Sequence, residues 1–287
     1  MCIVCNAFGA GPDTSAAWHV SSFSAFTPTG APAGAPPAGP AVPEREVGYA
    51  EFTGDPTLDS LLWGTRWTSP VLTYAFPETR AEWGGNFPAG AVGQALAPTD
   101  GLRAAVDLIL AGRTEVEGAP ATRFGSVASF TLLEFKPGTS EAATLRFGLG
   151  QNMAGLGFAG PPGVQATTPV VGVAGGVPEI REGDTWLNAL GRGDATHWDL
   201  GTLLPGSEEW MTLTHEIGPA LGLPHPFTGP VLAGTPASVM PDQWNGNEFT
   251  VMAYNGAPGP GASTGYPAQG SSPQSWMTYD IRALQHL

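Results

Sequence analysis

The sequence predicts an α/β (α+β) fold of two lobes, in which a twisted mixed sheet and one long helix form an upper lobe and irregular chain forms a lower lobe. Apolar runs of strand length and a capped helix occupy the region before residue 150. A second capped helix is expected from Ser207, and the chain after Gly222 is rich in Gly, Pro and Ser, which favours loops. A cleft is expected where this helix meets the lower lobe.

The expected elements follow from local patterns. Strands are predicted at 71–76, 126–135, 143–148 and 170–173. Helices are predicted at 56–63, from Thr99 or Asp100 to about residue 115, from Ser207, and from Tyr279 to the end. Ser207 is a typical N-cap, and Glu208 and Glu209 behind it are favourably placed near the positive end of the helix.

The chain is expected to divide into a leader, residues 1–45, and one folded domain, residues 46–287. Residues 27–43 consist almost wholly of Gly, Ala and Pro, which cannot form a core and favour extended, polyproline-like chain. The two cysteines, Cys2 and Cys5, lie in this leader. A C-x-x-C pair can be redox-active or half of a zinc site, but no second pair or βαβ context follows. A flexible leader or a removable propeptide is therefore expected.

The charge of the protein excludes some partners. Its 25 acidic and 11 basic residues give a net charge of −14, which argues against nucleic-acid binding because that requires a basic face. No stretch approaches the roughly 18 continuous apolar residues of a membrane span. The N-terminus lacks the charged and apolar regions of a Sec signal peptide. We expect a monomer that contacts proteins or peptides.

The most informative stretch runs from His215 to His225 and has the sequence HEIGPALGLPH. In a zinc helix, histidines four residues apart lie on one face and share a metal ion, and the glutamate after the first is placed as general base. A glycine then turns the chain so that a third histidine completes the ligands, and water takes the open position. His215, Glu216, Gly222 and His225 fit this pattern, but Pro219 stands where the second histidine belongs.

A second motif, FTVMAY at residues 249–254, follows His225 by about two dozen residues. Together the two motifs resemble the catalytic domain of the serralysins, secreted bacterial zinc endopeptidases of the metzincin class. The resemblance extends over about residues 61–287. It includes SLLWGTRW at 60–67, GDTWLN at 183–188 and MTYDIRALQ at 277–285.

The resemblance implies a metzincin-type fold and one Zn²⁺, held by His215 and His225. It implies that Glu216 takes a proton from a zinc-activated water and returns it to the leaving amine, while Tyr254 stabilises the oxyanion. Met252 is implied to be the Met-turn residue beneath the metal. The resemblance also implies type I secretion to the extracellular space; the calcium-binding RTX repeats that usually follow are absent, and no calcium motif occurs in this chain.

In relatives of this kind, an edge strand pairs with the substrate backbone. We expect that edge at residues 170–176, with Val171, Val173 and Ala174 binding substrate. The resemblance gives no cleavage preference.

Pro219 leaves the function open between two classes. Its ring carries no ligand and no N–H for the His215 carbonyl, which costs roughly 3 kcal/mol in a helix interior. The chain is a natural pseudoprotease, or a substitute ligand such as His19, His197 or His286 completes the site, or residue 219 has been changed in an active enzyme. The expected function is therefore a zinc-dependent endopeptidase of extracellular proteins with impaired activity, or an inactive module that binds peptides.

Overall fold

The structure is a computed structural model that describes residues 46–113, 125–153, 155–163, 180–191, 198, 200–201, 203–228, 238–256 and 272–287. Several sequence predictions lie outside these residues and are not tested: the leader with Cys2 and Cys5, the strand at 170–173, the substrate-binding residues Val171, Val173 and Ala174, and the substitute ligands His19 and His197. None of the described helices has the length and apolar character needed to cross a membrane.

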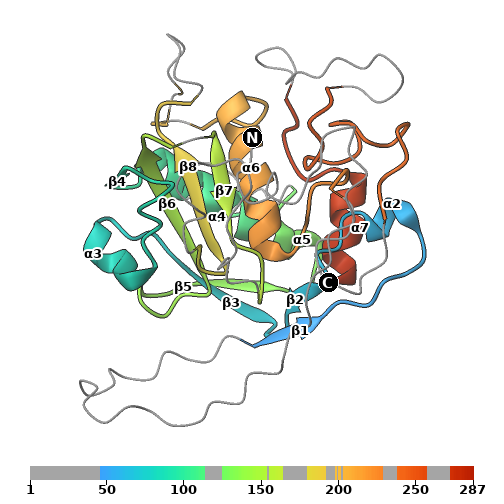
Figure 1. The fold of residues 1–287 in the computed structure, drawn as a ribbon, viewed down its shortest axis with the longest axis horizontal. Helices are drawn as coiled ribbons and strands as arrows, with labels where there is room; N and C mark the ends of the chain where they lie inside the picture. Colours follow the sequence, from blue (N-terminus) through green and yellow to red (C-terminus); the bar gives the residue numbers. More distant parts are fainter. Residues whose placement is uncertain are drawn as a thin grey trace.

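The expected mixed sheet is present (Figure 1). Its main strands, in spatial order, are β5 (Glu134–Pro137), β3 (Val71–Ala75), β6 (Leu145–Gln151), β8 (Asp184–Asn188) and β7 (Gly157–Ala159). The first four are parallel to one another, whereas β7 is antiparallel to β8. A further strand, β4 (Gln94–Leu96), pairs antiparallel with β6, and β1 (Val47–Tyr49) and β2 (Thr65–Trp67) form a separate ribbon.

The described helices differ widely in length. They are α2 (Pro56–Asp59), α3 (Arg80–Trp83), η1 (Gly84–Asn86), α4 (Asp100–Ala111), α5 (Val127–Phe130), α6 (Glu208–Leu221) and α7 (Thr278–His286). Helix α6 packs against β7 and β8, and α4 contacts both α6 and β5. Helix α7, red in Figure 1, lies beside α2 and α5.

Each face of the sheet covers its own core. Phe147, Leu149 and Leu187 point into the larger core with α4, α6 and α7. Trp186 and Phe158 point to the opposite face and pack with Trp83 of α3. This alternation follows from the two-residue period of a strand, and it places α6 over the face that carries the larger core.

Three sequence predictions need correction. The helix expected at 56–63 covers only Pro56–Asp59 and ends at the C-cap Ser60. The strand expected at 126–135 is wrong for residues 127–130, which form α5; the hydroxyls of Ser129 and Thr131 donate to carbonyls three or four residues earlier and stabilise this turn instead. The strand begins only at Glu134, which pairs with Val71. Helix α4 ends at Ala111 rather than near residue 115, because Gly112 adopts a left-handed conformation (φ 67°) that terminates it.

Helix α6 begins as the sequence predicts. The Ser207 side chain accepts a hydrogen bond from the Trp210 amide at 3.2 Å, and Glu208 and Glu209 occupy the first turn. Every residue from Trp210 to Leu221 is buried. A helix buried all round is usually apolar, so the buried Thr, His and Glu side chains of α6 mark it as the element to examine for function.

Candidate functional site

The two histidines of the motif converge. His215 lies in the middle of α6, and Gly222 ends the helix with φ 110°, a left-handed conformation that turns the chain back toward it. The chain then brings His225 alongside His215, and the Nε2 atoms of the two rings lie 2.9 Å apart. His215 is 4% exposed and His225 is fully buried. Helix spacing and a single left-handed glycine therefore bring together two residues that the sequence predicts as partners.

The hydrogen-bond network assigns the protons of this pair. His215 Nδ1 lies 2.7 Å from the Val251 carbonyl, which can only accept, so Nδ1 carries the hydrogen and Nε2 is a bare acceptor. His225 Nε2 must therefore donate to it. This leaves His225 Nδ1 without a hydrogen, and it is a buried atom with no hydrogen-bond partner among the described residues.

Burial keeps both imidazoles neutral. Desolvation lowers the pKa of His215 to about 4, although its bond to the Val251 carbonyl opposes the shift. Desolvation, and secondly the neighbouring His215, hold the pKa of His225 well below its ordinary value of 6.5. Neutral imidazole is the form that binds metal ions, and a backbone carbonyl on Nδ1 is the usual way of aiming Nε2 at one.

Glu216 follows His215 on α6 and is 1% exposed. Its side chain lies against β7: a Cβ atom added to Gly157 would come within 2.6 Å of Glu216 Cγ and 2.7 Å of the Trp186 carbonyl oxygen. Gly157 is thus a close-approach glycine that allows the carboxylate-bearing helix to pack on the sheet edge.

Aromatic rings surround the pair. The Tyr254 ring lies 4.5 Å from the His225 ring in an edge arrangement and 5.6 Å from the His215 ring in a stacked one. Phe227 stacks on His225 with centroids 5.1 Å apart. The structure therefore brings Tyr254 beside both histidines, as the sequence suggests. Phe227 was not predicted; its place two residues after His225 is the only signal for it in the sequence.

Met252 lies beneath the helix. It is fully buried, and a Cβ atom at Gly218 would collide with its sulfur. Only glycine at 218 lets the turn that carries Met252 approach α6 so closely. Because Gly218 immediately precedes Pro219, Met252 packs against the turn of α6 where the second ligand would stand.

Asp280 is a site residue that sequence reasoning missed. Its fully buried carboxylate accepts hydrogen bonds from Thr250 Oγ1 (2.5 Å), the Val251 amide (2.8 Å) and the Met277 amide (2.9 Å). Burial raises its pKa to about 6 against the lowering effect of these bonds. Val251 thus donates to Asp280 and accepts from His215, so α7 holds the turn that orients the histidine.

A catalytic zinc ion requires a fixed spacing of its ligands. Zinc binds imidazole nitrogen at about 2.0–2.1 Å, so two tetrahedral ligands lie roughly 3.3–3.4 Å apart. At 2.9 Å the histidines are hydrogen-bond partners and would have to separate slightly to share an ion. Pro219 is buried in α6, and its side chain has no atom that can coordinate a metal ion.

No other ligand joins the pair within the described part of the chain, where no group of three His, Cys, Asp or Glu side chains is placed to hold a metal ion. The suggested substitute His286 lies elsewhere: it is exposed at the end of α7, with Nε2 2.6 Å from the Glu51 carbonyl oxygen. The described residues therefore supply two ligands and do not fit a three-ligand site.

Comparison with known proteins adds no family assignment. No protein-family model matches the sequence, and no curated protein matches it.

Proposed function

We propose that the chain is a peptide-binding domain on the scaffold of a zinc endopeptidase, with its capacity for hydrolysis reduced or lost. The observation that carries the proposal is the closed histidine pair: His215 and His225 bond to each other, and the third ligand position is Pro219. A catalytic zinc site needs three protein ligands and an open position for water. Two imidazoles and the side chain of Pro219 supply only two of these ligands.

The edge of the sheet beside α6 supports peptide binding. Strand β7 bonds to β8 through residues 156, 158 and 160, as the Leu156 carbonyl and Gly160 amide bonds indicate. The amide and carbonyl groups of Gly157 and Ala159 therefore face away from β8, and within the described residues they have no backbone partner. An extended peptide pairing with this edge would satisfy them, and Glu216 packs against the same strand.

Burial of this edge predicts that peptides associate slowly. Gly157, Phe158 and Ala159 are all buried. The strand must therefore become exposed before a peptide can pair with it. Association that requires such a change is slower than the typical range of about 10⁵–10⁷ M⁻¹s⁻¹. Because pairing uses backbone groups, we expect little dependence on peptide side chains.

A second candidate is a working zinc endopeptidase, in which a ligand outside the described residues replaces the missing histidine. The specific observation in its favour is the tautomer of His215, whose Nδ1–H is held by the Val251 carbonyl so that the Nε2 lone pair is directed at His225. Glu216 follows His215 on α6, and the Tyr254 and His215 ring centroids lie 5.6 Å apart. Pro219 is the residue that counts against this candidate.

Zinc content separates the two candidates. We would measure zinc per chain by elemental mass spectrometry on dialysed protein, and casein cleavage with and without chelator, for the wild type and Glu216→Ala. The proposed function predicts well under one equivalent and no chelator-sensitive cleavage. About one equivalent, with cleavage that both chelator and Glu216→Ala abolish, would establish the second candidate.

Peptide binding needs its own experiment. Surface plasmon resonance with unstructured peptides should show slow association, and peptides N-methylated at alternate residues should not bind, since they keep the side chains but lose the pairing N–H groups. Ala159→Pro should also abolish binding, because it removes an outward amide and leaves the bonds to β8 intact. Equal binding of methylated and unmethylated peptides would refute pairing along β7.

A further inference from the structure

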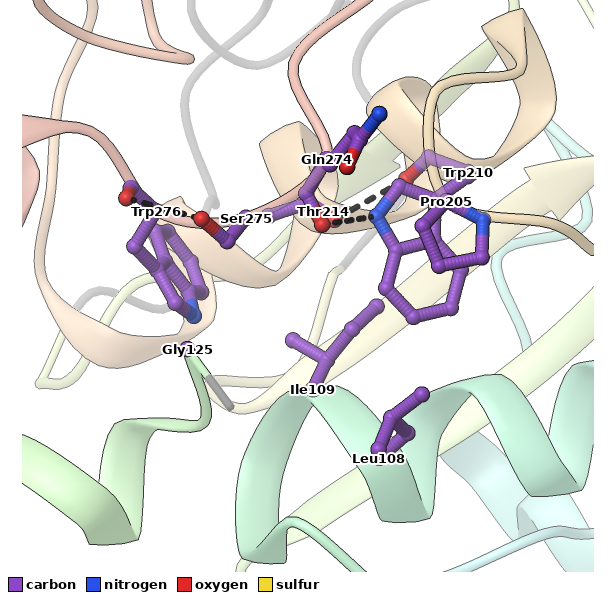
Figure 2. Close-up of a pocket in the computed structure, with 9 residues that line it drawn as sticks. All are labelled: Leu108, Ile109, Gly125, Pro205, Trp210, Thr214, Gln274, Ser275 and Trp276. Atoms are coloured by element: carbon purple, nitrogen blue, oxygen red, sulfur yellow. Dashed lines mark hydrogen bonds between the residues drawn. The ribbon is translucent and has the colours of Figure 1, made fainter. Parts of the chain in front are cut away.

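A small cavity lies between α4, α6 and the segment 274–276 that leads into α7 (Figure 2). Its volume is about 170 Å³. Leu108 and Ile109 rise into it from α4, and Trp210 of α6 and Trp276 close two of its sides. None of the described residues that line it carries a charged side chain. The cavity is separate from the histidine pair.

Most polar atoms around the cavity are already engaged. The Trp210 Nε1–H donates to the Gln274 carbonyl at 2.9 Å, and the Thr214 hydroxyl donates to the Trp210 carbonyl at 2.9 Å. The Ser275 hydroxyl donates to the Trp276 carbonyl at 3.3 Å. These bonds satisfy the donors of Trp210, Thr214 and Ser275 around a mainly apolar space, which the exposed side chain of Gln274 also borders.

Trp276 is the exception. It is 2% exposed, and its Nε1–H has no hydrogen-bond partner within the described part of the chain. Figure 2 shows its ring nitrogen at the edge of the indole nearest Gly125, which also lines the cavity. A buried donor left unpaired is destabilising, so a ligand with an acceptor that reaches it would bind more tightly.

The size of the space limits what that acceptor belongs to. An apolar cavity of about 150 Å³ is known to bind benzene. A space of similar volume accepts one six-membered ring with a short substituent. A water molecule would satisfy the Trp276 donor but needs two to four polar partners, and the surrounding donors point at backbone carbonyls.

We propose that this cavity binds a small neutral aromatic molecule that carries one carbonyl group, with the ring between Ile109 and Trp210 and the oxygen accepting from Trp276 Nε1–H. The described lining residues carry no charge, which disfavours acids and amines because these would lose their hydration without a partner. The proposal does not rest on the function proposed above, because Trp210 and Thr214 line the cavity whereas His215 does not.

The test uses two probes of nearly equal shape, acetophenone and α-methylstyrene, in which a carbonyl oxygen is replaced by a CH₂ group. Their dissociation constants would be measured by ligand-detected NMR for the wild type and Trp276→Phe. A raw difference between the probes reflects their own hydration, so the informative quantity is the ratio of the two constants. We expect Trp276→Phe to reduce the relative preference for acetophenone by about two- to tenfold, the effect of one hydrogen bond.

A measurement on the unaltered protein guards against misfolding of the variant. The assigned indole N–H signal of Trp276 should move downfield when acetophenone is added and much less with α-methylstyrene. An unchanged ratio in Trp276→Phe, an unmoved indole signal, or no binding of either probe up to its solubility limit would each overturn the proposal.

Discussion

Removal of the Asp280 carboxylate should damage the candidate site without touching a histidine. Asp280→Ala leaves three donors without an acceptor: the Thr250 hydroxyl and the amides of Val251 and Met277. Each buried unpaired donor costs about 1–3 kcal/mol, and some will find water, so we expect a loss of roughly 3–6 kcal/mol of unfolding free energy. Val251 would also lose the bond that fixes its carbonyl beneath His215.

Asp280→Asn is the matched control. Its amide oxygen can accept from the two backbone amides, and the Thr250 hydroxyl can rotate to accept from the new NH₂ group, so the shape of the network survives. We expect it to cost less than about 1 kcal/mol near neutral pH, because the amide loses a charge-assisted bond but also avoids the burial of a charge.

The pH dependence gives a second, independent signature. Burial raises the pKa of Asp280 from 3.8 to about 6, so the neutral carboxyl is the form favoured by folding. Its contribution is complete below pH 3.8 and is lost as the pH rises through 6, by about 3 kcal/mol in total. Between about pH 4.5 and pH 7.5 the wild type should lose about 2 kcal/mol relative to Asp280→Asn.

Urea denaturation followed by circular dichroism measures all three proteins at both pH values. A loss of less than about 1 kcal/mol of unfolding free energy in Asp280→Ala would contradict this prediction, because at least one of the three donors should remain unpaired. A wild-type to Asp280→Asn difference that is the same at both pH values would show that the carboxyl does not titrate as its burial requires.

Three further substitutions test other parts of the structure. Pro219→His should raise zinc affinity at least tenfold by isothermal calorimetry, since it restores a third ligand; no gain would mean that α6 can no longer aim a side chain there. Gly157→Ala should cost about 1–3 kcal/mol in urea denaturation, because the added carbon meets Glu216 and backbone, and a neutral result would contradict that close packing. Arg146→Met removes the bidentate partner of buried Asp184, which keeps its 3.1 Å bond from Arg181, so the cost should be at most about 3–5 kcal/mol; a loss under 1 kcal/mol would show that the pair is replaceable.

Local signals account for the parts of the fold that the sequence predicts well. The Thr99 and Ser207 caps mark the starts of α4 and α6, because a cap acts within three residues of its own position. The convergence of His215 and His225 is similarly local: one helix end and one left-handed glycine determine it. Strand β3 is also found where its apolar run predicts it, shorter by one residue.

Residues and strands that depend on partners distant in the sequence could not be predicted from local patterns. Asp280 acts on the turn at Val251 from a helix that begins after a long intervening segment, and the MTYDIRALQ segment that contains it does not show which groups it binds. Strand β7 is three residues long and stands in a glycine- and proline-rich stretch, so only its pairing with β8 defines it. The error at 127–130 arose because apolar content alone does not separate a strand from one helical turn stabilised by hydroxyl groups.

The second core contains a feature of practical use. Trp83 and Trp186 lie with ring centroids 4.1 Å apart and planes inclined by 32°, and the Arg146 guanidinium covers Trp83. Two indoles held this closely and at a fixed angle couple their electronic transitions, which gives a paired positive and negative band in circular dichroism. That optical signal originates on the face of the sheet opposite α6. It can therefore distinguish a variant that loosens only the histidine side of the molecule from one that unfolds the whole sheet.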